Sequence, residues 1–316
     1  MAQSASLLTR IVATSVSATV RAGKIIRDVM SEGGLNIVEK GKNDLQTEAD
    51  RCAQKCIITS LSRVFPNITI IGEEESNNCE VPSDWIVTEA DPEILNLKLP
   101  AHLEDIDPKD ICVWVDPLDG TSEYTQGLVE HVTVLVGVAI GERAIGGVIH
   151  QPYYKDNEKG ILGRTLWGID GAGYGGFSPT SPPDGKRFIT TTRSHSDSKV
   201  QAAINALSPD KVIRVGGAGH KVILLLEGKA HAYVFASKGC KKWDTCAPEA
   251  VLHAIGGTLT DFHGERYAYH AETMHPNVRG VLATAPGQVH QWYLSHIPEE
   301  MYIKNSLLQD IFKFQH

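Results

Sequence analysis

The strongest constraint on this chain is a run of apolar residues that ends in two carboxylates, Val113-Trp114-Val115-Asp116-Pro117-Leu118-Asp119-Gly120-Thr121. Residues 111–115 predict a short buried strand, because a short continuous apolar run suits a strand that is covered on both faces. Pro117 has no N–H to donate to a sheet, so the strand is expected to stop at Asp116 and the backbone to turn. Asp116 and Asp119 are therefore expected on one tight turn.

The donor groups in this turn suit a hard divalent cation beside a phosphate. Carboxylates, the Leu118 carbonyl and water are the oxygen ligands that Mg²⁺ prefers. Gly120 lets backbone N–H groups approach an anion, and the Thr121 hydroxyl can handle a proton. The stretch indicates a metal-assisted phosphate site, although a capped strand-to-turn junction would use the same residues.

The charge balance excludes several classes of partner. The chain of 316 residues carries 30 Lys and Arg against 38 Asp and Glu, a formal net charge of −8. This excess of acid argues against a nucleic-acid polymer or an anionic membrane as partner. No apolar run approaches the roughly 18–20 residues that span a bilayer. A small-molecule ligand is the expected partner.

The cysteines and the N-terminus together predict a reduced, cytoplasmic protein. The first eight residues lack the basic start and continuous apolar core of a secretory signal. Cys52 and Cys56 stand four residues apart on the apolar face of a predicted helix, which favours core thiols. No C-x-x-C pair and no Cys/His cluster at zinc spacing occurs among the six cysteines at 52, 56, 79, 112, 240 and 246.

Two amphipathic helices are predicted in the first part of the chain. Apolar residues at helical spacing cover 7–30 and 48–64, and Gly33-Gly34 follows the first as a stop signal. Thr47 is the expected N-cap of the second helix, with Asp50 at the capping-box position. A short strand at 69–72 and the hairpin-like strands at 132–140 and 144–150 complete this part of the pattern.

The remaining pattern divides the chain into two halves. Strands and helices alternate beyond residue 185, which predicts an α/β half at 186–316. Helices followed by strands predict an α+β half at 1–170, with most of the candidate metal ligands. The Gly-, Pro- and Ser-rich segment 171–185 is the expected linker, and the active site is expected between the halves.

Some local patterns carry lesser expectations. The polar, Pro-punctuated segment 76–110 predicts a surface loop. A helix is expected from Thr245 to Ile255, with Pro248 in its first turn, and a hairpin around 257–269. The G-x-G-x-x-G match at 171–176 is rejected as a dinucleotide motif, because the prolines that follow forbid the required helix.

Five acids stand at the ends of predicted elements. Each has a structural alternative: Asp50 as a capping acid, Glu73 as part of a solvated acidic run, and Asp244 as an N-cap. If they gather, like charges at short range would repel or take up protons, and divalent cations would relieve this. The five are Asp50, Glu73, Asp116, Asp119 and Asp244.

Three segments, in this order, resemble the signatures of the inositol-monophosphatase superfamily. They are Ile71-Gly72-Glu73-Glu74, the stretch Trp114 to Thr121, and Trp243-Asp244 with Ala247-Pro248-Glu249. Members of this superfamily are lithium-sensitive, Mg²⁺-dependent phosphatases. The resemblance covers nearly the whole chain and implies a layered α/β/α/β/α fold with two to three Mg²⁺ ions. A monomer is expected, because relatives with the nucleotide specificity described next are usually monomeric.

Further segments resemble the branch of this superfamily that acts on nucleotide bisphosphates. They are 119–127, 190–196, 214–221 and 234–244. The resemblance implies hydrolysis of the 3'-phosphate of adenosine 3',5'-bisphosphate to AMP, and also of 3'-phosphoadenylyl sulfate. Ser122 stands where this branch is expected to carry a lysine.

The resemblance also implies a role for each matching residue. Asp50 and Thr121 would form the proton-accepting pair that positions and activates the attacking water. N–H groups at Gly120 and Thr121 would receive the scissile phosphate. The metal ligands would be Glu73, Asp116, the Leu118 carbonyl, Asp119 and Asp244, and the nucleotide-binding residues Thr192, His195, Gly217 and Lys221.

Three other functions remain open at this point. A phosphatase acting on the 1-phosphate of inositol polyphosphates, such as inositol 1,4-bisphosphate, would share the metal site. A sensor that binds metal or nucleotide without catalysis would need neither Asp50 nor Thr121, and both are present. An exonuclease would also use clustered acids, but a polymer substrate conflicts with the net charge of −8.

Overall fold

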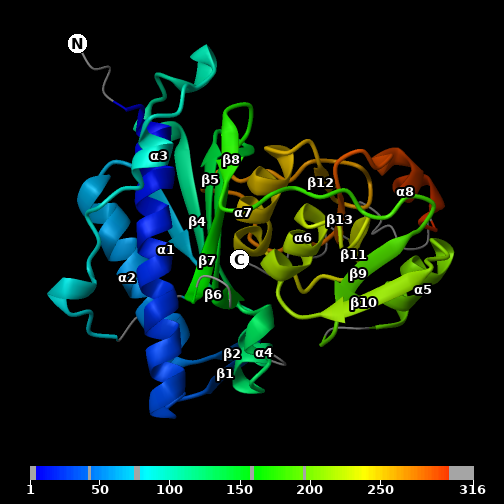
Figure 1. Cartoon of the computed structure of the whole chain (residues 1–316), viewed down its shortest axis with the longest axis horizontal. Helices are drawn as coiled ribbons and strands as arrows, with labels where there is room; N and C mark the ends of the chain where they lie inside the picture. Colours follow the sequence, from blue (N-terminus) through cyan, green and yellow to red (C-terminus); the bar gives the residue numbers. More distant parts are fainter. Residues whose placement is uncertain (1–4, 42–43, 75–78, 157–159, 195–196, 299–316) are drawn as a thin grey trace.

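Two β-sheets alternate with three layers of helices in the computed structural model, which describes residues 5–41, 44–74, 79–156, 160–194 and 197–298 (Figure 1). One outer layer holds α1 (Leu7–Glu32) and α2 (Glu48–Val64). The layer between the sheets holds α6 (Ala218–Leu226) and α7 (Lys242–His253), and the other outer layer holds α5 (Ser198–Ala206) and α8 (His290–His296). The predicted α/β/α/β/α layering is confirmed.

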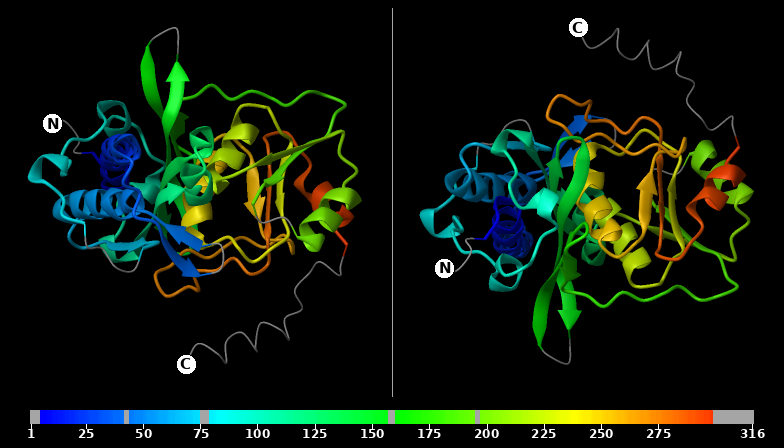
Figure 2. Two further views of the ribbon diagram at one scale, coloured as in Figure 1. Left: turned by 90° about the horizontal axis from the view of Figure 1, so that it is seen from below. Right: turned by 90° about the horizontal axis from the view of Figure 1, so that it is seen from above.

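The first sheet has six strands in the order β3-β4-β5-β6-β7-β8. β3 and β4 are parallel, and the other neighbours are antiparallel. The β6–β7 hairpin extends past the other strands (Figure 2). The bounds are β3 Thr69–Gly72, β4 Ile111–Asp119, β5 Thr133–Ile140, β6 Arg143–Asp156, β7 Ile161–Ile169 and β8 Gly173–Gly175.

The second sheet has five strands in the order β10-β9-β11-β13-β12. β9, β10 and β11 are parallel to one another, and β13 runs antiparallel to both β11 and β12. A separate hairpin pairs β1 (Val38–Gly41) with β2 (Asp44–Gln46). The bounds are β9 Phe188–Thr192, β10 Lys211–Val215, β11 Ala232–Phe235, β12 Thr258–Thr260 and β13 Val281–Thr284.

The first sheet separates two hydrophobic cores. Successive side chains of a strand point to opposite faces. Trp114 therefore packs among the residues between the two sheets, whereas Val113 and Val115 pack against the α1 and α2 side. β4 is buried on both faces, which explains why its first five residues form a continuous apolar run.

The two N-terminal helices form where the sequence predicts them. Ser6 accepts the backbone N–H of Thr9 as the N-cap of α1, and Gly33 ends that helix with a φ of 76°. α2 has the predicted bounds, and its capping box of Thr47 and Asp50 is present. Local capping residues therefore set the start and the end of α1 and the start of α2.

The prediction that β4 stops at Asp116 was wrong. The strand continues to Asp119, and its register against β5 shifts between Asp116 and Asp119. This irregularity accommodates Pro117, whose missing N–H would otherwise leave a gap in the ladder. β3 pairs with β4 only as far as Val115, so the last residues of β4 have a strand on one side only.

Two segments differ from their predicted form. Segment 76–110 is not simply a surface loop, because Ile94 and Leu103 are buried in the core beside α1. It contains the short helix α3 (Pro92–Leu95) and 3-10 turns at Ser83–Trp85, Ala101–Leu103 and Pro108–Asp110. The expected hairpin at 257–269 is also wrong, since β12 pairs with β13, a strand farther along the chain.

The cysteine prediction needs a correction. Cys52 forms a disulfide with Cys79, 27 residues away, and Cys56 is a buried free thiol as expected. This pairing depends on how the segment after β3 folds back onto α2, which spacing alone does not reveal. Within the described ranges, no helix combines the length and apolar character needed to cross a bilayer.

We expect the unfolded, unreduced protein to present four reactive thiols: Cys56, Cys112, Cys240 and Cys246. The remaining two cysteines are held in the disulfide. Titration with a thiol reagent in denaturant, before and after reduction, measures both numbers. Six thiols without reductant would contradict the Cys52–Cys79 bond.

Candidate active site

A pocket of about 280 Å³ is lined by residues from both halves of the chain. Elements around the first sheet contribute Glu73, Asp119 and the short helix α4 (Thr121–Thr125). The second half of the chain contributes α6 and the start of α7, which carries Asp244. Eight of the predicted site residues line it: Glu73, Asp119, Gly120, Thr121, Thr192, Gly217, Lys221 and Asp244.

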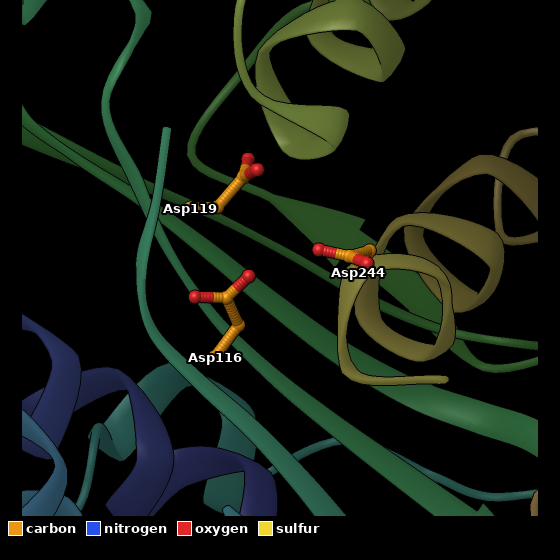
Figure 3. A group of neighbouring side chains, drawn as sticks. All are labelled: Asp116, Asp119 and Asp244. Carbon is orange, nitrogen blue, oxygen red and sulfur yellow. The ribbon is translucent and has the colours of Figure 1, made fainter. Parts of the chain in front are cut away.

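Three carboxylates lie close together (Figure 3), and two of them, Asp119 and Asp244, line the pocket. Asp116 and Asp119 lie on the last part of β4, and Asp244 lies in the first turn of α7. Oxygen atoms of the three lie within 4.8 Å of one another. Because oxygen donors at this spacing are the ligands of hard cations, the cluster fits Mg²⁺.

Burial and mutual repulsion both disfavour charge on these acids. Burial first, and then the neighbouring carboxylates, raises the pKa of Asp116 well above its ordinary value. Burial and then Asp119 raise the pKa of Asp244 to about 6. A bound cation would reverse both effects, because it stabilises the charged form.

Glu73 lies beside the cluster at the end of β3. Its backbone N–H donates to Val115 O at 3.0 Å, which continues the pairing of β3 with β4. Burial raises the pKa of Glu73 to about 8, and Lys40 opposes this shift from 3.4 Å. Lys241 lies 4.0 Å from the same carboxylate. Glu73 is therefore part of a partly neutralised acidic site and not a solvated run.

Asp50 combines the two roles that the sequence left open. Its Oδ2 accepts the backbone N–H of Thr47 at 2.7 Å, as a capping acid does. Its Oδ1 lies 3.1 Å from the hydroxyl of Thr121, which also lies 3.0 Å from the carbonyl oxygen of Leu118. Burial raises the pKa of Asp50 to about 6. A proton acceptor thus touches the hydroxyl next to the acid cluster.

Asp244 uses the same local geometry, which corrects the predicted start of its helix. α7 begins at Lys242, three residues earlier than expected, so Asp244 is its third residue. The backbone N–H of Lys241 donates to Asp244 Oδ2 at 2.5 Å. Pro248 consequently lies inside the helix, beyond its first turn. The capping bond therefore uses Oδ2 of Asp244 and does not involve Oδ1.

Gly120 makes the turn that carries the chain from β4 into α4. It adopts a φ of 95°, which favours glycine, and it is the residue before the first turn of the helix. Both Gly120 and Thr121 line the pocket. Backbone N–H groups at a helix start can bind an anion, and the contact of these two with a phosphate stays a prediction.

The other side of the pocket comes from the second half. Thr192 ends β9, and Gly217 immediately precedes α6. Lys221 is buried, donates from Nζ to Gly217 O at 2.8 Å, and lies 5.4 Å from the ring centroid of Tyr233. Burial lowers the pKa of Lys221, and Asp119 opposes this shift. His195 lies outside the described residues.

Aromatic side chains that the sequence analysis did not name as site residues form another wall. Tyr233 and Phe235 from β11, together with Trp243, line the pocket. The two β11 residues stand two apart in a strand, so they share a face. That spacing is a usable signal, but only the tertiary structure shows that this face meets the acid cluster.

Comparison with known proteins identifies the family. The sequence pattern of the Inositol monophosphatase family matches residues 7–302 of this chain. The chain belongs to this family.

Three relatives align with most of the chain. The human protein named 3'(2'),5'-bisphosphate nucleotidase 1 is 52% identical over 311 residues, which cover 98% of this chain and 100% of that protein. A Dictyostelium discoideum protein of the same name is 38% identical, over 86% of this chain and 91% of its own. The bovine Golgi-resident adenosine 3',5'-bisphosphate 3'-phosphatase is 32% identical, over 92% and 80% respectively.

Solved structures share the inositol monophosphatase fold. The suhB protein of Bartonella henselae superposes with a TM-score of 0.65 at 19% identity, covering 90% of this chain and 96% of its own. The 2'AMP-bound form of SaIMPase-II superposes with a TM-score of 0.63 at 16% identity, covering 94% and 96%. At these identities the likeness supports the fold alone.

One acid of the third family signature does not join the site. Glu249 is buried in α7 and accepts the hydroxyl of Tyr269 at 2.6 Å. Burial raises its pKa to about 8, and the nearby His253 has its pKa lowered to about 4. Glu249 is therefore an uncharged acid in the core over much of the pH range.

We expect Glu249→Gln to stabilise the protein increasingly from pH 5 to pH 8. The pKa of Glu249 is raised on folding, so its contribution to stability is full below the unfolded value near 4.5 and is lost as the pH rises through about 8. Glutamine keeps an acceptor for Tyr269 without a charge. Thermal unfolding of both proteins at several pH values measures the difference.

The exposed Glu142→Gln is the matched control, and it should show no gain that grows with pH. A difference between wild type and Glu249→Gln that is equal at pH 5 and pH 8 would contradict the buried, neutral acid.

Proposed function

We propose that this chain is a phosphatase that removes the 3'-phosphate of adenosine 3',5'-bisphosphate, leaving AMP and phosphate. We extend the proposal to 3'-phosphoadenylyl sulfate, which carries the same 3'-phosphate. The observation that carries it is the contact of Asp50 with Thr121 beside the three gathered acids. The high identity to proteins named 3'(2'),5'-bisphosphate nucleotidase 1 supports the substrate.

We propose that the acidic site holds two to three Mg²⁺ ions. The candidate ligands are oxygen donors throughout, with no sulfur or imidazole among them, which suits Mg²⁺. When bound, Mg²⁺ supplies a Lewis acid for the phosphate and lowers the pKa of water. The proposed ligands are Glu73, Asp116, the Leu118 carbonyl, Asp119 and Asp244.

The proton follows a short path in this proposal. Water attacks phosphorus opposite the 3'-oxygen, and its proton passes to the Thr121 hydroxyl, which hands its own proton to Asp50. The bond between phosphorus and the 3'-oxygen breaks, and that oxygen takes up a proton from the solvent to become the ribose hydroxyl. Asp50 later returns its proton to the solvent through the Thr121 hydroxyl. The N–H groups of Gly120 and Thr121 bind the departing phosphate.

The nucleotide is proposed to occupy the wall formed by the second half. The buried ammonium of Lys221 supplies positive charge for the second phosphate. Thr192 and Gly217 offer a hydroxyl and a backbone group on the same wall, and His195 is proposed as a further contact. Tyr233 and Phe235 offer apolar surface to a base.

The test is phosphate release by purified protein in Mg²⁺ from three separate substrates. Adenosine 3',5'-bisphosphate should release phosphate with accumulation of AMP, and AMP itself should release none. If inositol 1,4-bisphosphate alone were hydrolysed, the proposed Mg²⁺ site would stand and the proposed nucleotide substrate would be wrong. Binding of Mg²⁺ or nucleotide with no turnover of any substrate would favour a non-catalytic sensor.

Three further proposals concern organisation. The halves 1–170 and 186–316 are proposed as structural units, because each sheet draws its strands from one side of the linker, apart from the short β8. A monomer is proposed for the solution state. A cytoplasmic location stays a prediction, and the Cys52–Cys79 disulfide weighs against it because such bonds are rare in the cytosol.

A further inference from the structure

The carboxylate of Asp119 is held by three hydrogen-bond donors at once. Thr133 donates its hydroxyl to Oδ2 at 2.6 Å, and the backbone N–H of Gly219 donates to the same oxygen at 2.8 Å. The backbone N–H of Ala218 donates to Oδ1 at 2.7 Å. Asp119 and Thr133 are both buried, so no bulk water competes for these bonds.

These bonds leave the two oxygens of Asp119 unequal. An ionised carboxylate oxygen has about two lone-pair sites. Two donors occupy Oδ2, whereas one donor occupies Oδ1, so a single site remains on Oδ1. Asp119 can therefore offer a cation one oxygen, in an orientation that the three donors determine.

The backbone donors come from the other half of the chain. α6 begins after Gly217, which has no side chain to cap it, and Asp119 accepts the N–H groups of its first two residues from 99 and 100 positions away. A Cβ on Gly219 would lie 2.5 Å from Thr133 Oγ1, so glycine is what lets the three groups meet.

Thr133 stands opposite Asp119 in the ladder of β4 with β5. It is the first residue of β5, and its hydroxyl is the only side-chain donor that the described residues direct at Asp119. The Asp119 carboxylate is therefore held from two sides: by the Thr133 hydroxyl, which the pairing of β4 with β5 places opposite it, and by the backbone N–H groups at the start of α6.

We propose that Thr133 is a positioning residue for the Mg²⁺ site, because it orients Asp119 so that Oδ1 alone faces the cation. The proposal rests on the proposed Mg²⁺-dependent function, but it concerns metal binding and does not depend on which phosphate ester is the substrate. Thr133 touches neither substrate nor metal in this role.

The test is Thr133→Val, which replaces the hydroxyl with a methyl group of similar size. We expect Mg²⁺ affinity, measured by calorimetry without substrate, to fall about 10–100-fold, as is typical when the partner of a ligand is removed. The Mg²⁺ concentration for half-maximal phosphate release should rise by a similar factor, while KM for the nucleotide at saturating Mg²⁺ changes little.

Thr190→Val is the matched control. Thr190 is also fully buried in a strand, and its hydroxyl has no hydrogen-bond partner among the described residues. This variant should keep wild-type Mg²⁺ affinity. Thr133→Ser keeps the hydroxyl and should restore most of the affinity that Thr133→Val loses.

The outcomes separate positioning from a purely structural role. If Thr133→Val loses thermal stability equally with and without Mg²⁺ and binds Mg²⁺ as the wild type does, the proposal is overturned. If the valine variant does not fold, Thr133→Ala and Thr133→Ser are compared instead, and equal Mg²⁺ affinity in these two overturns it. Normal Mg²⁺ binding by wild type without phosphatase activity would refute the proposed function and not this inference.

Discussion

Asp50→Asn should lower kcat by roughly 10²–10⁴-fold, the range that a general base contributes, while Mg²⁺ binding and nucleotide binding persist. The reason is local. Asparagine can keep its oxygen toward the Thr47 N–H, but its amide group would then face the Thr121 hydroxyl, where a proton acceptor is needed. Single-turnover phosphate release, together with calorimetry of Mg²⁺ and nucleotide, measures the two effects separately.

The control for this substitution is Asp91→Asn. Asp91 caps α3 by accepting the N–H groups of Glu93 and Ile94, and it does not line the pocket. Asp91→Asn therefore measures how much stability the same substitution costs at a helix cap. The kcat of this variant should stay at the wild-type level. Wild-type turnover by Asp50→Asn would remove Asp50 from the mechanism and leave it as a capping acid only.

Asp116→Asn should act in opposite directions on stability and on activity. In the metal-free protein, burial and neighbouring carboxylates raise the pKa of Asp116, so a neutral amide relieves an unfavourable charge. We expect unfolding in EDTA to shift upward, at about 2–4 °C for each kcal/mol gained. Phosphatase activity should fall by at least ~10²-fold, because loss of a metal ligand removes several kcal/mol of transition-state stabilisation.

The decisive measurement is thermal unfolding of both proteins with EDTA and with Mg²⁺. The wild type should gain stability on adding Mg²⁺, whereas Asp116→Asn should gain little. Asp105→Asn, at an exposed position away from the pocket, should respond to Mg²⁺ as the wild type does. An Asp116→Asn protein that is less stable in EDTA and still stabilised by Mg²⁺ would refute the acid-cluster interpretation.

Helices α2 and α7 show why a structural and a functional interpretation of one residue need not compete. Asp50 and Asp244 are both the third residue of a helix, and each folds one oxygen back to the N-cap amide. The capping bond fixes the side chain, and the second oxygen is directed elsewhere. The hydrogen bond that caps each helix therefore also orients the carboxylate toward the site.

The sequence by itself determined the local elements and most of the candidate site. The apolar spacing of residues 48–64 and the Thr47–Asp50 capping box specify α2, and the short apolar run at 69–72 specifies β3. These features depend on residues within one or two turns of each other, so a linear pattern contains them. The acids at the ends of such elements follow from the same pattern.

The tertiary structure alone decided the contacts between distant segments. The Cys52–Cys79 bond, the continuation of β4 past Pro117 and the aromatic wall from β11 depend on how the layers stack. The hydrogen bonds that Thr133 and the first amides of α6 donate to Asp119 join residues up to 100 positions apart. No local periodicity encodes such pairs, because their formation depends on the packing of two sheets around the helices between them.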